Sequence, residues 1–255
     1  MAFLTAAGQR LEYQLIDPQR TSARWLVFLH EGLGSIAMWR DFPSRLCAAV
    51  GCRGLVFSRF GYGGSDPLTA PRLVDFMHDE ALVVLPAVLD HLHITDPILF
   101  GHSDGGSIAL LHAGLARRPL TAIVVLAPHV LVEDISITSI EAAKVAYDAT
   151  DLREKLRRYH DDPDSAFRGW NDIWLHPDFR SWNIEACLPG IRCPVLAIQG
   201  VDDEYGTLKQ IELIRRGAVN APVELLALPD CGHSPHRDQP EAVIAATRAF
   251  IERLP

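Results

Sequence analysis

Short apolar runs recur along the chain, and each is bounded by turn-forming residues. Several are nearly continuous, as in Ala-Ile-Val-Val-Leu-Ala at residues 122–127, which is typical of strands buried on both faces of a parallel sheet. The runs predicted to form strands are residues 11–16, 25–30, 54–59, 97–102, 121–127, 194–199 and 223–228. Since no helical pattern separates the first two, they are predicted to begin the sheet as an antiparallel pair.

Helical patterns lie between these runs. Residues 73–92 carry apolar side chains at spacings of three and four, which form one apolar face. Residues 105–116 are small and apolar, as expected for a buried helix, and residues 240–254 are amphipathic. Strands that alternate with helices indicate βαβ units. The predicted fold class is therefore α/β, with a mainly parallel central sheet flanked by helices.

The alternation stops between residues 129 and 188. We interpret this segment as a helical cap (lid) insert, and residues 1–128 and 189–255 as the core domain. The insert has two charged, helix-like pieces, residues 139–150 and 151–160, and an aromatic cluster of Phe167, Trp170, Trp174, Phe179 and Trp182. Two interpretations of the tryptophans remain open: they line a pocket for an acyl or aryl group, or they form a small core that holds the insert to the sheet.

The composition excludes several classes of protein. A formal net charge of −8 disfavours binding to nucleic acids or anionic membranes, which requires a basic face. The five cysteines form no C-x-x-C pair and fit neither a disulfide framework nor a zinc site. We find no signal-peptide pattern and no apolar run of about 18 residues that would span a membrane. The expectation is a cytoplasmic protein with reduced thiols.

One motif indicates a reactive serine. Gly101-His-Ser-Asp-Gly105 directly follows a buried strand and directly precedes a helix, which is the context of a nucleophile elbow. The glycines permit a sharp turn in which side chains two residues from the serine would clash. The helix N-terminus then directs N–H groups toward developing negative charge. Ser103 is the predicted nucleophile.

A serine hydroxyl needs a base, and the base needs a carboxylate to orient it. His233 lies in a loop after the last predicted strand and is the predicted base, with His236 in the same loop as its rival. Asp203 follows the preceding strand and is the predicted carboxylate. The competing carboxylates are Asp202, Glu204, Glu133 and Asp134. The order of serine, aspartate and histidine along the chain is one of the orders in which catalytic triads occur.

Backbone N–H groups must also bind the oxygen of a tetrahedral intermediate, and loss of one such donor typically costs about 3 kcal/mol. One predicted donor is the N–H of Asp104, directly after the nucleophile. The other is predicted in the glycine-rich turn at residues 30–35, where Gly32 and Leu33 are alternatives.

Together these segments resemble the α/β-hydrolase family. The resemblance covers residues ~25 to 255 and implies a carboxylesterase-like serine hydrolase that needs no cofactor or metal. Glu31 departs from the family pattern, because relatives commonly have His-Gly at that point. The segments that carry the resemblance are His30-Glu-Gly-Leu-Gly-Ser35, Ser58-Arg-Phe-Gly-Tyr-Gly-Gly-Ser-Asp66, Gly101-His-Ser-Asp-Gly-Gly106, Gly200-Val-Asp-Asp203 and Cys231-Gly-His-Ser-Pro-His236.

Asp104 has two further interpretations. The elbow is similar to the Gly-Trp-Ser-Asp-Gly-Gly elbow of valacyclovir hydrolase, where the aspartate is associated with the amino group of amino-acid esters. The resemblance implies the same contact for Asp104. Alternatively, the side chain points away from the cleft and bonds to neighbouring backbone or to Arg59.

The predicted activity is hydrolysis of small carboxylic esters through an acyl-enzyme, with a small-molecule ester or related acyl compound as substrate. The same triad also serves C–C bond hydrolases of meta-cleavage products and enol-lactonases. Hydrolases of these two kinds often carry tryptophan after the catalytic histidine, where this chain has Ser234, and this difference disfavours both alternatives. From a different class, a hydrolase-like protein that binds a ligand without turnover is a third hypothesis. A homodimer is compatible with the sequence.

Overall fold

The computed structural model describes residues 2–17 and 24–254. Within these residues the chain forms an eight-stranded sheet. The strands at its centre consist of apolar residues that are buried on both faces, as their sequence pattern predicts. The strands are β1 (Ala2–Ala6), β2 (Gln9–Ile16), β3 (Trp25–Leu29), β4 (Arg53–Phe57), β5 (Ile98–His102), β6 (Ala122–Leu126), β7 (Val195–Gly200) and β8 (Val223–Leu228).

The strand order is β1-β2-β4-β3-β5-β6-β7-β8. The strands from β4 to β8 run parallel, whereas β2 is antiparallel to both β1 and β4. The sheet was predicted to begin with an antiparallel pair formed by the strands now labelled β2 and β3. The structure confirms that β2 is antiparallel, but β2 pairs with β1 and β4 and not with β3. The short strand β1 was not predicted from the sequence. Because the strands from β3 to β8 are parallel, the loops that follow them all meet at one edge of the sheet.

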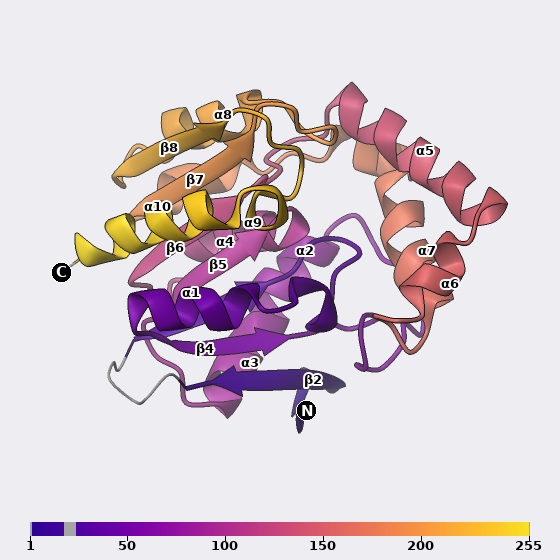
Figure 1. Cartoon of the computed structure of the whole chain (residues 1–255), viewed down its shortest axis with the longest axis horizontal. Coiled ribbons are helices and arrows are strands. Elements are labelled where there is room, and N and C mark those ends of the chain that lie inside the picture. The colour runs from indigo at the N-terminus through magenta and orange to yellow at the C-terminus, as the bar shows by residue number, and fades with distance from the viewer. Residues whose placement is uncertain (1, 18–23, 255) are drawn as a thin grey trace.

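Helices cover both faces of the sheet (Figure 1). On the near face, α1 and α10 pack through Phe42, Leu46, Val243 and Phe250. The central helix α4 is buried on the other face with α3 and α8. The sequence pattern had indicated the helices at α4 and α10 but not α1 or α8. The helices of these layers are α1 (Phe42–Val50), α2 (Phe76–Asp79), α3 (Leu85–His91), α4 (Asp104–Leu115), α8 (Lys209–Gly217), α9 (Pro235–Asp238) and α10 (Pro240–Glu252).

The predicted helix at residues 73–92 is interrupted by a wider turn. Between α2 and α3 the backbone forms a π-helical segment, η2 (Glu80–Val84). Pro86 follows it at the start of α3. Proline has no N–H to donate to the preceding turn and its ring crowds the carbonyl there, so a π-type turn accommodates it without ending the helix.

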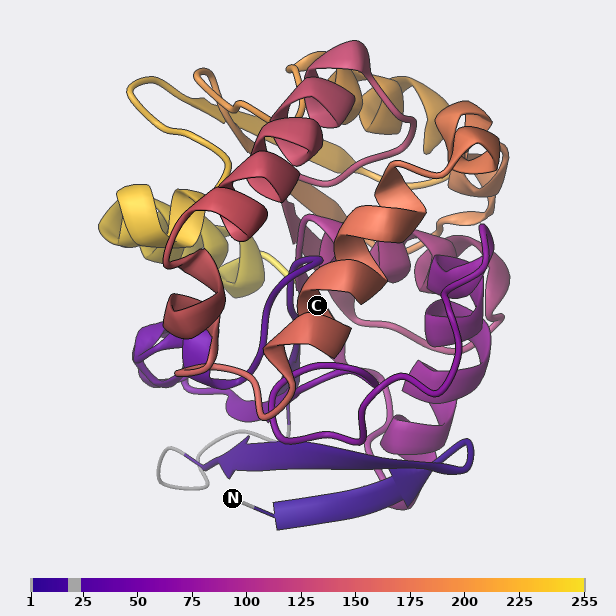
Figure 2. The ribbon, with the colours of Figure 1, turned by 90° about the vertical axis from the view of Figure 1, so that its right-hand side faces the viewer.

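Between β6 and β7 the chain leaves the sheet and forms α5 (Asp134–Ala149), α6 (Leu152–Leu156) and α7 (Pro163–Trp174), followed by the 3₁₀ turns η3 (Pro177–Ser181) and η4 (Glu185–Gly190). Figure 2 shows α5 and α7 lying across the edge at which the parallel strands end. Trp170 and Trp174 of this segment line the same cavity as Ser103 and His233. No helix in the described part of the chain has the length and apolar character to cross a membrane.

Candidate active site

Ser103 lies in the sharp turn between β5 and α4. Its backbone has φ 52° and ψ −119°, a conformation that is strained for any residue other than glycine. A Cβ on Gly101 would lie 2.3 Å from the carbonyl oxygen of Gly105, and a Cβ on Gly105 would lie 2.0 Å from that of Leu29. The turn therefore requires glycine at both positions, and it places Ser103 at the carboxyl edge of the sheet.

The predicted serine, histidine and aspartate lie in one hydrogen-bonded line. His233 Nε2 is 2.9 Å from Ser103 Oγ, and His233 Nδ1 is 2.8 Å from Oδ1 of Asp203. The carboxylate of Asp203 accepts the N–H of Tyr205 at 2.8 Å, which fixes its orientation. Because ionised Asp203 can only accept, Nδ1 carries the proton and Nε2 is free to accept the hydroxyl proton of Ser103.

The electrostatics of this line favour a basic imidazole. Burial lowers the pKa of His233, but the hydrogen bond and charge of Asp203 outweigh burial, so the pKa lies above its ordinary value of 6.5. Burial likewise raises the pKa of Asp203, and the hydrogen bond from His233 outweighs it and lowers the pKa below 3.8. Asp203 is therefore ionised at neutral pH and stabilises the imidazolium form of His233.

The rival histidine is directed elsewhere. His236 is buried, with its ring 4.7 Å from that of Trp39 and 5.5 Å from that of Phe42. Neither of its ring nitrogens has a hydrogen-bond partner among the described residues. Burial holds the pKa of His236 well below 6.5. This histidine is therefore a neutral core residue, and only His233 of the two reaches Ser103.

The rival carboxylates are also engaged elsewhere or exposed. Asp202 is exposed to solvent. Glu204 accepts the backbone N–H of His233 at 3.1 Å rather than its ring. Glu133 bonds to the segment before α8, and Asp134 pairs with an arginine of η3. Of the candidates, only Asp203 contacts the imidazole of His233.

The glycine-rich turn after β3 lies beside Ser103. The N–H of Gly34 donates to the carbonyl of Glu31 at 3.1 Å and closes the turn. A Cβ on Gly32 would lie 2.2 Å from Cδ1 of Trp170, so this position has no room for a side chain. The N–H groups of Gly32, Leu33 and Asp104 donate to no protein acceptor within the described residues. Which of these N–H groups would bind an oxyanion therefore remains a prediction.

A cavity of about 140 Å³ opens at the triad. Its wall is formed by the glycine-rich turn, the elbow, the His233 loop and helices of the segment over the sheet edge. The lining combines apolar and aromatic residues with a similar number of serine, histidine and glutamate residues. The lining residues are Glu31, Gly32, Leu33, His102, Ser103, His129, Ser136, Ile140, Trp170, Trp174, Tyr205, His233 and Ser234.

The three tryptophans considered for substrate binding separate into two groups. Trp170 and Trp174 line the cavity at the triad. Trp182 is not among the lining residues; its ring stacks on Phe179 at 5.4 Å and lies 6.4 Å from that of Trp174. The position of Trp182 thus fits the interpretation in which the tryptophans form a small core. The positions of Trp170 and Trp174 fit the interpretation in which they line a pocket.

The side chain of Asp104 points behind the cavity wall. Its Oδ1 accepts the indole N–H of Trp174 at 3.2 Å, and its Oδ2 lies 3.7 Å from the guanidinium of Arg59. Burial raises the pKa of Asp104 more than the positive charge of Arg59 lowers it. Of the two interpretations of this carboxylate, the contacts fit the one in which it bonds to Arg59.

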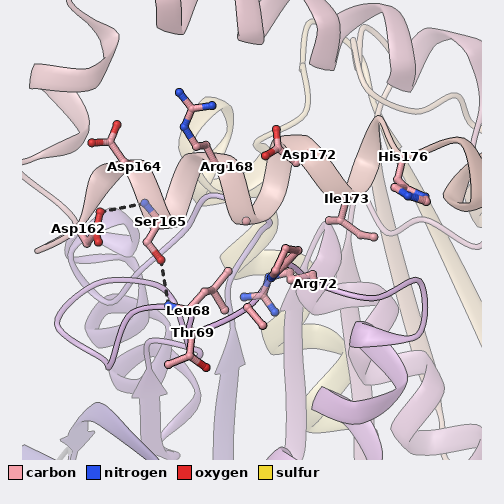
Figure 3. A pocket seen from close by; sticks show the side chains of 13 residues that line it. Leu68, Thr69, Arg72, Asp162, Asp164, Ser165, Arg168, Asp172, Ile173 and His176 are labelled. Atoms are coloured by element: carbon pink, nitrogen blue, oxygen red, sulfur yellow. Dashed lines mark hydrogen bonds between the residues drawn. The ribbon is translucent and has the colours of Figure 1, made fainter.

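A second, larger cavity of about 440 Å³ lies between the loop at residues 68–72 and α7 (Figure 3). The backbone N–H of Leu68 donates to the hydroxyl of Ser165 across one end of it. Charged groups surround it, including Arg72, Arg168 and Asp172. None of the triad residues lines this cavity, so volume alone does not identify the reactive site.

Several residues at the triad were not predicted from the sequence. His129, Ser136, Ile140 and Tyr205 line the cavity, but their positions carry no motif. His129 is fully buried, and burial lowers its pKa to about 3, so the ring is neutral. The described residues contain no group of three or more histidine, cysteine or carboxylate side chains arranged to hold a metal ion.

A comparison with curated proteins gives a partial relative. The chain is 26% identical over 191 residues to the dihydrolipoyllysine-residue acetyltransferase component of the acetoin cleaving system of Pseudomonas putida. The match covers 69% of this chain and 50% of the relative, so the chain spans about half the length of that protein.

Solved structures with the same fold include three enzymes. Proline iminopeptidase from Mycobacterium smegmatis gives a TM-score of 0.79 at 19% identity, covering 99% of this chain and 97% of that one. An esterase from Thermogutta terrifontis gives 0.74 at 19% identity, covering 99% and 98%. The enol-lactonase from Burkholderia xenovorans LB400 gives 0.74 at 17% identity, covering 99% and 100%. At these identities the likeness concerns the fold.

The sequence model of the alpha/beta hydrolase family matches residues 26–246, which include every strand from β4 to β8 and all three residues of the hydrogen-bonded line. The match agrees with the sheet order, with the strained serine between β5 and α4, and with the order of serine, aspartate and histidine along the chain. This chain belongs to the alpha/beta hydrolase family.

Proposed function

We propose that this hydrolase cleaves small carboxylic esters through an acyl-enzyme intermediate, with Ser103 as nucleophile, His233 as general base and Asp203 as the group that orients the base. The observation that carries the proposal is the pair of contacts at His233, 2.9 Å to Ser103 Oγ and 2.8 Å to Asp203 Oδ1. Both lie within the range that proton transfer requires.

In the first half-reaction, Oγ of Ser103 attacks the ester carbonyl while His233 accepts the hydroxyl proton. The new C–O bond converts the carbonyl oxygen into an oxyanion. The N–H of Asp104, together with that of Gly32 or Leu33, donates hydrogen bonds to it. When the intermediate collapses, the bond to the alcohol breaks and His233 returns the proton to the leaving oxygen. The product of this step is acyl-Ser103.

In the second half-reaction, water replaces the alcohol. His233 accepts a proton from the water as it attacks the acyl carbon, and the same N–H groups bind the second oxyanion. Collapse releases the carboxylic acid and returns the proton to Oγ of Ser103. Asp203 remains ionised throughout and stabilises the imidazolium that forms twice in each cycle.

The size and lining of the cavity support a small acyl group. The volume of about 140 Å³ is enclosed by Trp170, Trp174 and Ile140, which offer apolar contact but little space. We infer that residues 129–188 act as a cap that limits the length of the acyl chain. The esterase likeness agrees with this substrate class but shows only the fold.

Enol-lactones are a second candidate substrate, because a lactone is a cyclic carboxylic ester and the same steps open its ring. The likeness to an enol-lactonase over 99% of this chain agrees with this candidate but shows only the fold. A panel of p-nitrophenyl esters, enol-lactones and vinylogous 1,5-diketones separates the three. We expect turnover of the esters or lactones and none of the diketones.

The direct test is turnover of p-nitrophenyl acetate and butyrate by the wild-type protein and by Ser103→Ala. The variant lacks the nucleophile, so we expect turnover to fall by about 10⁴-fold or more with an unchanged circular dichroism spectrum. Ser165→Ala, in the second cavity, is the matched control and should retain full activity. Equal turnover by the wild type and Ser103→Ala would overturn the proposal.

A further inference from the structure

A buried histidine outside the cavity joins two turns that follow strands of the sheet. His160 lies in the loop between α6 and α7 and is 3% exposed. Its Nδ1 is 3.0 Å from the backbone nitrogen of Gly63, in the turn after β4. Its Nε2 is 3.3 Å from the carbonyl oxygen of Leu33, in the glycine-rich turn. Leu33 lines the cavity at the triad and His160 does not, so the ring contacts the wall of the cavity from its outer side.

The two partners of His160 determine which of its nitrogens carries the proton. A backbone N–H can only donate, so Nδ1 must present its lone pair to Gly63. A carbonyl oxygen can only accept, so Nε2 must carry the hydrogen that faces Leu33. His160 is therefore a neutral ring with its proton on Nε2. Burial lowers the pKa of His160 to about 4, which agrees with a neutral ring at neutral pH.

A second contact fixes the position of His160 relative to the sheet. The N–H of Asp161 donates to the carbonyl of Gly63 at 2.9 Å, so both polar backbone groups of Gly63 bind this loop. Gly63 has φ 60°, and a Cβ there would lie 2.3 Å from Oγ of Ser58. The backbone conformation and the close approach both require glycine at this position. The loop between α6 and α7 is thus held at two points on the turn after β4.

The turn after β4 is itself bound to the glycine-rich turn. The N–H of Arg59 donates to Nε2 of His30 at 2.9 Å, and the N–H of Ile36 donates to Oγ of Ser58 at 3.0 Å. These contacts hold the first residue of the glycine-rich turn and the residue directly after it. The contact from the imidazole holds the middle of the turn, at Leu33.

The peptide group between Leu33 and Gly34 is held at both of its ends. Its N–H, on Gly34, donates to the carbonyl of Glu31 at 3.1 Å. Its carbonyl, on Leu33, accepts from His160. Neighbouring peptide groups share a Cα atom, so fixing this one restricts the direction of the N–H of Leu33. That N–H is one of the two candidates for the second oxyanion donor.

We propose that His160 is a positioning residue for the glycine-rich turn, in which Nε2–H holds the carbonyl of Leu33 while Nδ1 is bound to Gly63. The inference rests on the proposed function, in which the N–H of Leu33 or Gly32 binds the oxyanion. Docking of the proposed cap at Gly63 and stabilisation of the oxyanion then depend on one side chain. His160 does not touch the substrate and takes no part in proton transfer.

Nuclear magnetic resonance of the ¹⁵N-labelled protein tests the tautomer. At about pH 7, Nδ1 of His160 should resonate as an unprotonated nitrogen and Nε2 as a protonated one, without the averaging of a ring that exchanges between tautomers. The signals are assigned by their absence in His160→Gln. A proton on Nδ1 would exclude the contact with Gly63 and overturn the proposal.

Two amide variants separate docking of the loop from positioning of the turn. His160→Gln retains an N–H at about the reach of Nε2, and His160→Asn retains an acceptor at about the reach of Nδ1. We expect kcat for p-nitrophenyl butyrate to fall by about 10-fold in His160→Asn and in His160→Leu, because a misplaced donor costs less than a lost one. His160→Gln should stay within about 3-fold of the wild type. Equal kcat values for His160→Gln and His160→Asn, at equal thermal unfolding, would overturn the proposal.

An inhibitor that forms an oxyanion tests whether the effect passes through the glycine-rich turn. Ser103 attacks butyl trifluoromethyl ketone to form a hemiketal whose oxyanion occupies the place of the tetrahedral intermediate. Its inhibition constant should therefore rise in His160→Leu by about the factor by which kcat/KM falls. A lower kcat with an unchanged inhibition constant would overturn the proposal. His176→Leu, at an exposed histidine of the segment over the sheet edge, is the matched control and should change neither value.

The two proposals fail in distinguishable ways. If the wild-type protein hydrolyses no ester and Ser103 reacts with no fluorophosphonate, the proposed function fails and the positioning role fails with it, whatever the tautomer of His160. If Ser103 is reactive and His160→Leu retains the kcat and the inhibition constant of the wild type, the proposed function stands and the positioning role is wrong. Thermal unfolding of each variant identifies a loss of activity that comes from loss of folded protein.

Discussion

Two regions form the wall of the small cavity, and they are held in place by different interactions. At the sheet edge, Ser103, His233 and Asp203 are fixed by directed hydrogen bonds and by a strained turn. Across from them, Trp170 and Trp174 are fixed mainly by the packing of aromatic rings in the segment over the edge. Directed bonds set distances narrowly, whereas packing tolerates substitution at similar volume. Under the proposed function, we therefore expect substitutions at the sheet edge to change the rate of the reaction and substitutions in the helices to change the choice of acyl group.

The largest effect is expected at the sheet edge. Asp203→Asn keeps the shape of the side chain but removes the charge and favours the wrong tautomer of His233, so kcat should fall by about 10⁴-fold. Asp202→Asn, at the exposed neighbouring position, is the control and should leave kcat unchanged. Both values come from steady-state hydrolysis of p-nitrophenyl butyrate. A greater loss in Asp202→Asn than in Asp203→Asn would reverse the assignment.

A smaller and different effect is expected from the helices. Trp170→Leu enlarges the cavity while leaving the triad intact, so the ratio of kcat/KM for hexanoate to that for acetate should rise by about 10-fold. Trp182→Leu removes a ring that packs outside the cavity lining and should lower stability without changing the ratio. If both variants change the ratio equally, the assignment of Trp170 to the substrate pocket and of Trp182 to packing alone is wrong.

The pH dependence of kcat/KM tests the electrostatic environment of His233 at the sheet edge. Protonated His233 cannot act as a base, so activity should rise with pH through a midpoint above 6.5, because Asp203 holds the pKa of His233 above its ordinary value. The charge of Glu204 also raises this pKa. In Glu204→Gln the protonated form of His233 is stabilised less. The midpoint of the pH profile of kcat/KM should therefore move to lower pH by about 0.5 unit. A midpoint that moves upward would contradict the sign of this interaction.

The smallest effect concerns selectivity at Asp104. Because its carboxylate contacts Arg59 and Trp174 behind the cavity wall, Asp104→Asn should change the rates for an amino-acid ester and a neutral ester by the same factor. The measurement compares p-nitrophenyl esters of valine and of isovaleric acid. A selective loss with the valine ester would instead show that the carboxylate reaches the amino group of the substrate.

The contrast between the sheet edge and the helices above it also explains which features could be predicted from the sequence. The fold and the positions of Ser103, Asp203 and His233 follow from local patterns, because a parallel strand brings the residues after it to one known edge. The antiparallel neighbours of β2 were not predictable in this way, since pairing of distant strands leaves no local signal. Helices α1 and α8 were also missed.

The cavity lining was less predictable for a related reason. The side-chain directions in the segment over the edge depend on how α5 and α7 pack, and periodicity alone does not give them. Trp170 and Trp182 therefore looked equivalent in the sequence. Tyr205 and His129 gave no signal at all, because loop residues reach the site only through the tertiary fold. Glu31 was visible as a departure from the family pattern, but its place in the lining of the cavity was not.

The most direct test of the triad is the labelling of Ser103 by a fluorophosphonate, with peptide mass spectrometry to locate the adduct. We predict one adduct, on Ser103, at a rate that falls about 10³-fold or more in His233→Gln, which lacks the base. An adduct on a different serine, or labelling that is equally fast in His233→Gln, would contradict the claim that these three side chains act as one unit.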